Sequence, residues 1–149
     1  MRRVVITGMA GFSPIGNDWK TISSNLRNSK TGIQYMGGWE PYKKLATRLG
    51  APVTDFKKPE HYSRKMVRSM GRVALMATVA TERALENAKL TNNTSVIDGR
   101  MGISYGSSTG STDAQIDIAN MILGHYPPNR GLNVNSYLKM AGHTTAINI

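Results

Sequence analysis

The pattern of apolar residues along the chain first predicts two short buried strands. Residues 4–6 form a run of Val, Val and Ile that ends at Thr7 and Gly8. Residues 101–106 form a second short apolar run, which leads into a loop of small residues. Short apolar runs that end in turn residues are typical of strands buried on both faces. We expect a further short strand near residues 51–53.

Longer apolar stripes predict helices. Asn17 is expected to cap a first helix, because its side-chain oxygen can accept from the helix N-terminus. The apolar residues of that helix fall on one face: Trp19, Ile22 and Leu26. The strongest stripe covers residues 63–89, is rich in alanine and is expected to break near residues 70–71. Two further helices are expected over residues 113–123 and from residue 136 onward.

The order of these elements is strand, helix, irregular excursion, long helix, strand and helix. That order is typical of an α/β fold with a parallel or mixed sheet. The excursion, residues 33–62, holds three prolines and a Gly-Gly pair and shows no sustained period. The chain stops on an apolar residue, Ile149, without a charged tail. We therefore expect it to be part of a longer protein.

Composition narrows the possible chemistry. With 149 residues and 40% hydrophobic content, the chain resembles a globular domain rather than a disordered one. It has no cysteine, which excludes a disulfide scaffold, a thiolate zinc site and a cysteine nucleophile within these residues. No apolar run approaches about 18 residues, and no signal peptide precedes the first strand. We expect no membrane span and a cytoplasmic location.

Charge is unevenly distributed. The net charge is +10, and residues 1–75 alone hold 14 basic and 4 acidic side chains. If the chain is helical from Ser63, then Arg64, Arg68 and Arg72 follow one edge at i, i+4 and i+8, with Lys65 beside them. Such a ridge suits phosphates and carboxylates. An acidic partner, a nucleic acid and a merely solvated surface all remain open, although no helix-turn-helix, RRM or KH pattern is present.

Two glycine-containing loops follow the predicted strands. The glycines of residues 8–16 are spaced G-x-x-G-x-x-x-x-G, which departs from the dinucleotide-binding fingerprint. Residues 106–111 either hold a substrate through backbone amides or pack closely against another segment. No metal site is expected, because the three histidines are far apart in sequence: His61, His125 and His143. No catalytic constellation is visible.

Taken in order, several segments resemble the β-ketoacyl-acyl carrier protein synthases. The resemblance is carried by residues 3–9, 13–17, 29–33, 63–65, 68, 70, 100–103, 106–111 and 141–143. Any one of these motifs is common, but their ordered set along essentially the whole chain is specific. Residues 105–110 and 143–148 look most similar to the ketosynthases of aryl polyene clusters.

This resemblance implies a fold and a reaction. The implied fold is the N-terminal portion of a thiolase-like fold, a layered αβαβα arrangement with a mixed sheet, working as a homodimer or as a heterodimer with a ketosynthase-like partner. The implied enzyme is an acyltransferase of fatty acid or aryl polyene synthesis. It condenses malonyl-carrier protein, with decarboxylation, onto an acyl thioester held by a cysteine. In the family that cysteine follows the position of Ile149. Residues 1–149 are thus expected to be truncated before the nucleophile and inactive alone.

The resemblance also implies binding residues, but no catalytic residue within this chain. The implied docking residues for acyl carrier protein are Arg64, Lys65, Arg68 and Arg130. The implied acyl-pocket residues are Ser108, Thr109 and Gly110. Thr109 stands where the elongation enzymes commonly carry an Ile gate. No cofactor is expected, because the substrate itself carries phosphopantetheine.

Two alternatives remain at this point. One is a chain-length-factor-like partner, which lacks the cysteine by design. The other is a basic nucleic-acid-binding module, which would account for the net charge of +10. The carrier-protein interpretation explains the same charge without nucleic acid, because carrier proteins are acidic.

Overall fold

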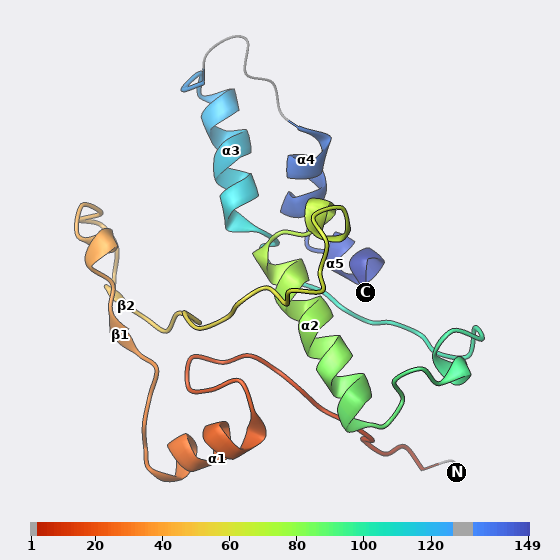
Figure 1. The fold of residues 1–149 in the computed structure, drawn as a ribbon. Helices are drawn as coiled ribbons and strands as arrows, with labels where there is room; N and C mark the ends of the chain where they lie inside the picture. The colour runs from red at the N-terminus through yellow and green to blue at the C-terminus, as the bar shows by residue number, and fades with distance from the viewer. Residues whose placement is uncertain (1–2, 127–132) are drawn as a thin grey trace. The chain divides into compact units, whose positions relative to one another are not determined.

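The computed structural model describes residues 3–126 and 133–149, which divide into two compact units (Figure 1). Unit 1 comprises Met1–Met9 and Lys58–Ile149, and unit 2 comprises Ala10–Lys57. The elements of unit 1 are the 3-10 helices η2 (Met66–Ser69) and η3 (Thr94–Val96) and the helices α2 (Arg72–Asn87), α3 (Thr112–Ile122), α4 (Val134–Met140) and α5 (Thr144–Asn148). Those of unit 2 are α1 (Trp19–Arg27), β1 (Gln34–Tyr35), η1 (Gly37–Trp39) and β2 (Leu49–Gly50).

Helix α1 begins one residue later than the sequence predicts. The cap is Asp18, not Asn17: Asp18 Oδ1 accepts the Thr21 backbone N–H at 2.9 Å, and Asp18 Oδ2 accepts the Thr21 hydroxyl at 2.6 Å. These hydrogen bonds lower the pKa of Asp18. A carboxylate is favoured at this position because it satisfies a free helix N–H and faces the positive end of the helix dipole.

Unit 2 contains one strand pair. β1 and β2 are antiparallel, with Gln34 opposite Gly50 and Tyr35 opposite Leu49. The strand expected at residues 51–53 therefore lies two residues earlier.

Helix α2 is the centre of the buried core of unit 1. The expected break before it is confirmed: η2 ends at Ser69, and Met70 is extended, with φ −89° and ψ 123°. Gly71 is needed there because a Cβ on it would lie 2.5 Å from the Ser111 Cβ. The buried residues around this helix are Met70, Ala74, Ala77, Thr78, Val79 and Ala80. The alanine-rich stripe is thus a close-packing face, as expected.

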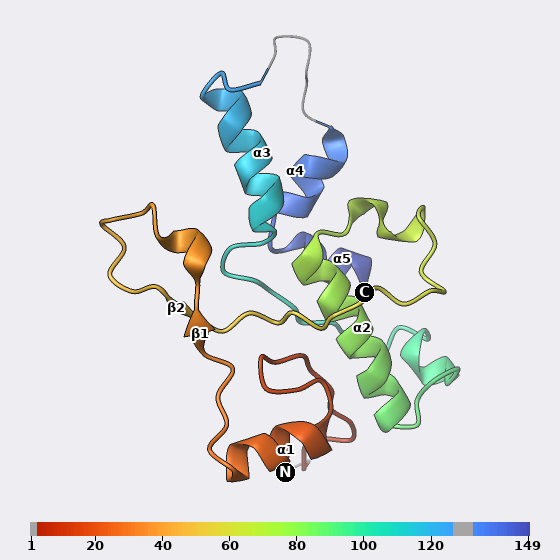
Figure 2. The ribbon, with the colours of Figure 1, turned by 60° about the vertical axis from the view of Figure 1, so that its left-hand side comes forward.

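The C-terminal helices pack on this core and on one another. α5 contacts α2, α4 contacts η2, and α3 lies beside α4 in both ribbon views (Figures 1 and 2). The helix expected from residue 136 forms as α4, but it is interrupted before α5. α4 ends where Ala141 becomes extended, with ψ 122°, and α5 starts again after His143. Between them, the Thr144 hydroxyl lies 2.6 Å from the carbonyl oxygen of Leu138.

The two strands predicted at residues 4–6 and 101–106 do not form in the described part of the chain. Both segments are without secondary structure, and Val4 and Ile6 are 96% and 82% exposed. Among the described residues, these two segments therefore belong to no sheet. A buried strand needs a partner strand, and no other described segment pairs with either of them.

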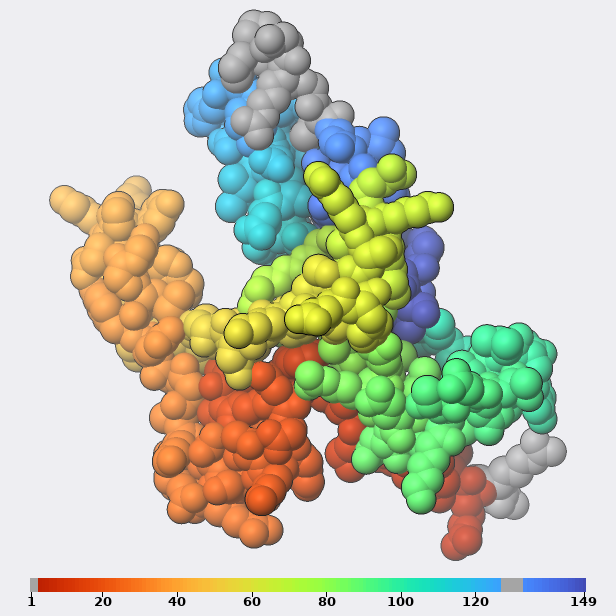
Figure 3. Space-filling model, viewed as in Figure 1, coloured from red at the N-terminus to blue at the C-terminus, as the bar shows by residue number. Residues whose placement is uncertain are grey.

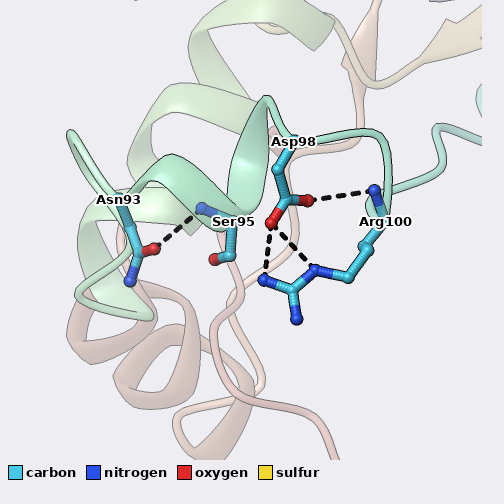
Figure 4. Close-up of polar contacts among 4 residues, drawn as sticks. All are labelled: Asn93, Ser95, Asp98 and Arg100. Carbon is cyan, nitrogen blue, oxygen red and sulfur yellow. Dashed lines mark hydrogen bonds and ion pairs between the residues drawn. The ribbon is translucent and has the colours of Figure 1, made fainter.

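The loop before residue 101 is fixed by side chains (Figure 4). The Asn93 side chain accepts the Ser95 N–H at 3.0 Å, which caps η3. Asp98 Oδ2 accepts from Arg100 Nε at 2.8 Å and from Arg100 Nη2 at 2.5 Å. These hydrogen bonds from Arg100 lower the pKa of Asp98. The chain therefore enters the segment at 101–106 from a defined turn.

Candidate functional site

The basic cluster predicted from the sequence lies around η2. Its four side chains are all exposed: Arg64, Lys65, Arg68 and Arg72. Ser63 caps the turn, because its Oγ accepts the Met66 N–H at 3.2 Å. The predicted continuous edge at i, i+4 and i+8 is wrong. The extended backbone at residues 70–71 interrupts the helix between Arg68 and Arg72. The cluster is therefore a short 3-10 turn followed by a separate helix start.

Three of these cations carry no internal counterion. Within the described residues, Arg64, Lys65 and Arg68 form no ion pair. Figure 3 shows the segment before α2, in yellow-green, with side chains that project from the surface. Exposed, uncompensated guanidinium and ammonium groups attract an acidic partner most strongly at low salt. The cluster can therefore bind carboxylates or phosphates.

A buried tyrosine holds the chain immediately before this cluster. Tyr62 is 2% exposed, and its hydroxyl donates to Glu82 Oε2 at 3.1 Å. His61 Nε2 lies 3.1 Å from Glu82 Oε1, and Lys58 Nζ donates to the Tyr62 carbonyl at 2.6 Å. Burial, and then the Glu82 carboxylate, raise the pKa of Tyr62 to about 12. The sequence gives no signal for this group, because Tyr62 and Glu82 are 20 positions apart along the chain.

The small-residue loop at 106–111 is closely packed against the end of α4. A Cβ on Gly110 would lie 1.9 Å from the Met140 carbonyl oxygen, and Gly110 has φ +64°. The Ser111 N–H donates to the Lys139 carbonyl at 3.3 Å. Ser107 Oγ accepts the Gly110 N–H at 3.0 Å. These contacts favour the packing interpretation at Gly110, since no Cβ fits there.

The three residues that the resemblance implies for the acyl pocket differ in their exposure to solvent. Ser108 and Thr109 are exposed, whereas Gly110 is buried. The Gln115 side chain of α3 donates to the Thr109 carbonyl. The loop thus presents two hydroxyls outward, while its glycine faces α4.

Unit 1 brings the two predicted residue sets to the same helix. η2 packs against α4, and Gly110 packs against the Met140 carbonyl at the end of α4. Gly71, between η2 and α2, lies against Ser111 of the loop. Arg64, Lys65 and Arg68 therefore belong to the same packed group of elements as residues 108–110. Arg130, the other implied docking residue, lies outside the described residues.

The described part of the chain was compared with two further kinds of site, a metal centre and a membrane-spanning helix. Residues 3–126 and 133–149 contain no group of three His, Cys, Asp or Glu side chains that could hold a metal ion. The three histidines lie apart: His61 beside Glu82, His125 beside Asn120, and His143 before α5. In the same residues, no helix has the length and apolar content needed to cross a bilayer.

The fold places the chain in a class of known proteins. It superimposes with a TM-score of 0.88 on the crystal structure of a β-ketoacyl synthase from Burkholderia phymatum STM815, at 40% sequence identity. The match covers 99% of this chain and 36% of that one. The chain therefore has the fold of part of a β-ketoacyl synthase, a thiolase-like α/β protein. The predicted fold class is confirmed.

The sequence comparison gives the family itself. Residues 1–145 match the family model described as Beta-ketoacyl synthase, N-terminal domain. The chain belongs to the β-ketoacyl synthase family, as its resemblance predicts.

Curated relatives agree with this assignment. The chain is 35% identical over 131 residues to 3-oxoacyl-(acyl-carrier-protein) synthase 2 of Staphylococcus aureus strain COL, covering 87% of this chain and 30% of that protein. It is 30% identical over 122 residues to 3-oxoacyl-(acyl-carrier-protein) synthase 1 of Buchnera aphidicola subsp. Baizongia pistaciae, covering 82% of this chain and 30% of that protein. The chain thus spans about a third of the length of the relatives it matches.

Proposed function

We propose that this chain contributes the carrier-protein docking surface of a 3-oxoacyl-carrier protein synthase. One observation carries the proposal: the chain belongs to the β-ketoacyl synthase family, and Arg64, Lys65 and Arg68 lie exposed and unpaired around η2. The proposed reaction of the whole protein is decarboxylative condensation of malonyl-carrier protein with an acyl thioester. A cytoplasmic location and a homodimeric or heterodimeric assembly remain predictions.

The chemistry of the partner supports this surface. A carrier protein is acidic, and its docking is steered by charge before the phosphopantetheine arm enters the enzyme. Guanidinium groups bind carboxylates in a bidentate manner, so two arginines beside a lysine suit an acidic helix. The nucleophile of the proposed reaction is not in these residues, because the chain has no cysteine. The 149 residues alone are therefore proposed to bind the carrier without condensing its cargo.

The docking proposal is tested with two charge-reversal pairs that change net charge equally. K65E/R68E reverses two of the four charges in the cluster around η2, and K43E/K44E reverses two exposed lysines in unit 2. Each pair lowers the net charge from +10 to +6. Calorimetric titration with acyl carrier protein should show an affinity loss of about tenfold or more for the first pair and a small loss for the second.

Two results would contradict this proposal. Equal losses in both pairs would mean that total charge, and not a local surface, attracts the carrier. Unchanged affinity in K65E/R68E, with circular dichroism showing an intact fold, would remove the docking assignment. Measurable condensation by the purified chain with acyl- and malonyl-carrier protein would refute its proposed inactivity alone.

The nucleic-acid alternative is separated by salt dependence. A DNA-binding module would lose affinity with salt at a slope set by the number of phosphates it neutralises. Titration of a labelled duplex at several salt concentrations measures that slope directly. Tighter binding to DNA than to carrier protein at physiological salt would favour the nucleic-acid function instead.

We also propose that Ser108, Thr109 and Gly110 border the acyl pocket, because Thr109 stands where the elongation enzymes that the sequence resembles carry a gating residue. Thr109 is exposed in this chain, and a hydroxyl there makes the proposed pocket wall smaller and more polar than an isoleucine would. In an active enzyme that contains this chain, Thr109→Ile should shift the preferred acyl length, measured as relative kcat/KM over a series of acyl-carrier proteins. Ser104→Ala is the control, and an unchanged preference in Thr109→Ile would remove Thr109 from the pocket.

A further inference from the structure

One carboxylate of α2 holds the two residues that come directly before the basic cluster. Glu82 Oε1 lies 3.1 Å from His61 Nε2, and Glu82 Oε2 accepts the Tyr62 hydroxyl at 3.1 Å. The rings of His61 and Tyr62 also meet edge to face, with 4.8 Å between their centroids. Both partners are twenty or more positions away from Glu82 along the chain. The contact therefore connects the start of the basic cluster to the long helix of unit 1.

The backbone on this side of the cluster is closed into a turn. Lys58 Nζ donates to the carbonyl oxygens of Pro59 and Tyr62, at 3.1 and 2.6 Å. The Tyr62 N–H donates to the Pro59 carbonyl at 3.2 Å. Because Tyr62 is 2% exposed, the turn has a buried side chain at its end. The position of Tyr62 on α2 therefore sets where the chain enters η2.

The other end of η2 is also held by side chains. The Ser69 hydroxyl donates to Asn148 Oδ1 at 2.8 Å, and Met70 is 8% exposed. Lys65 and Arg68 thus lie on a short turn that is fixed on both sides, while they themselves form no ion pair among the described residues. A surface that already has its binding conformation loses less conformational entropy when a partner docks.

We propose that Glu82 is a positioning residue for carrier binding. Through His61 and Tyr62 it holds the segment before η2 in the arrangement that the carrier protein recognises. This inference rests on the proposed function for the identity of the partner. The charge of Glu82 by itself acts in the opposite direction, because a carboxylate next to a basic cluster weakens its attraction for an acidic partner. Positioning and charge therefore predict opposite effects when Glu82 is neutralised.

The test compares two charge-matched variants of α2. Glu82→Gln and Glu86→Gln each raise the net charge from +10 to +11. Glu86 is exposed, and its side chain forms no ion pair within the described residues. Calorimetric titration with acyl carrier protein should show an affinity loss of about fivefold or more for Glu82→Gln. The affinity of Glu86→Gln should be unchanged or slightly higher, since an exposed charge contributes little.

A second pair of variants separates the hydrogen bond from the ring contact. His61→Phe keeps an aromatic ring beside Tyr62 but removes the donor to Glu82, whereas His61→Gln keeps a donor. His61 is exposed, so neither change should prevent folding, which circular dichroism checks. We expect carrier affinity to fall about threefold or more in His61→Phe and to stay close to the original value in His61→Gln. Such a rescue requires the contact with Glu82 and not merely a folded chain.

Two results would overturn the positioning role. One is equal carrier affinity in Glu82→Gln and Glu86→Gln while K65E/R68E still weakens binding, which would leave the docking surface intact without Glu82. The other is equal affinity in the two His61 variants.

Failure of the unaltered chain to bind the carrier would contradict the proposed function, and hydrogen exchange then tests the positioning separately. The backbone amides of residues 63–69 should exchange about tenfold faster in Glu82→Gln than in Glu86→Gln, because the segment opens more often without its contact to α2. Equal exchange rates in the two variants would show that Glu82 does not hold this segment.

Discussion

The hydroxyl of Tyr62 is a residue-scale link between α2 and the start of the basic cluster. It is buried and donates to Glu82, and its pKa is raised to about 12. Tyr62→Phe should lower the free energy of unfolding at neutral pH by about 1 kcal/mol, because it removes this hydrogen bond. Tyr105→Phe alters an exposed tyrosine for which no side-chain hydrogen bond is seen, and it should be neutral. Urea titrations of both variants measure the difference.

The raised pKa of Tyr62 also predicts a pH dependence. The unfolded tyrosine ionises near its ordinary pKa of about 10, whereas the folded one stays protonated to about 12. The contribution of this group is therefore complete below pH 10 and is lost as the pH rises from about 10 to 12. The stability of Tyr62→Phe should fall less steeply over that interval. Parallel curves for the two proteins would contradict the assignment.

Gly110 offers a test of whether residues 106–111 pack against α4, a question that the sequence alone leaves open. Its φ is +64°, and a Cβ would lie 1.9 Å from the Met140 carbonyl oxygen. Gly110→Ala should therefore destabilise the chain by about 2 kcal/mol or more, measured by thermal or urea unfolding. The same change at Gly106, which has open space around it, is the control. A tolerated Gly110→Ala would show that the loop does not pack on α4 in solution.

Residue roles could be predicted where they depend on local chemistry, and less well where they depend on packing. The Ser63 hydroxyl oxygen accepts the Met66 N–H three positions later, a local hydrogen bond typical of a serine at the start of a turn. Asn17 and Asp18 are both good caps, and the sequence pattern alone chose the wrong one. The partners of Glu82 are twenty or more positions away along the chain, a separation that no local pattern reports.

At the scale of elements, one side-chain hydrogen bond connects η2 to α5. The Ser69 hydroxyl donates to Asn148 Oδ1 at 2.8 Å across 79 positions of sequence. Ser69→Ala should cost about 1 kcal/mol in unfolding free energy. Ser104→Ala, at an exposed serine, should cost little. In a double-mutant cycle with Asn148→Ala, a coupling energy near zero would show that the two elements are held together by other contacts.

Helices and strands differed in how well the sequence predicted them, for a physical reason. A helix satisfies its backbone hydrogen bonds locally, so the stripes of α2 and α3 were predicted nearly at their observed bounds. A strand needs a neighbour, and the runs at residues 4–6 and 101–106 have none among the described residues. Their composition still agrees with the strand prediction, while the missing partner decides the observed conformation.

At the scale of the whole molecule, the net positive charge is shared between the two compact units. Unit 2 holds seven basic and three acidic residues, and unit 1 holds twelve and six. The net charge of +10 is therefore distributed as +4 and +6. Only part of it belongs to the cluster around η2. For this reason the charge-reversal pairs in the two units are a fair comparison between local docking and general attraction.

The extent of exposed surface predicts how the whole chain unfolds. An unfolded chain of 16.3 kDa exposes about 23,600 Å², so folding to 11574 Å² buries about 12,000 Å². A compact monomer of this size buries about 16,000 Å². Because the urea m-value is proportional to the area exposed on unfolding, it should be roughly three quarters of the value usual for this length. A urea titration followed by circular dichroism measures it. A full-sized m-value would mean that the isolated chain buries more of its surface in solution than the 11574 Å² of exposed area implies.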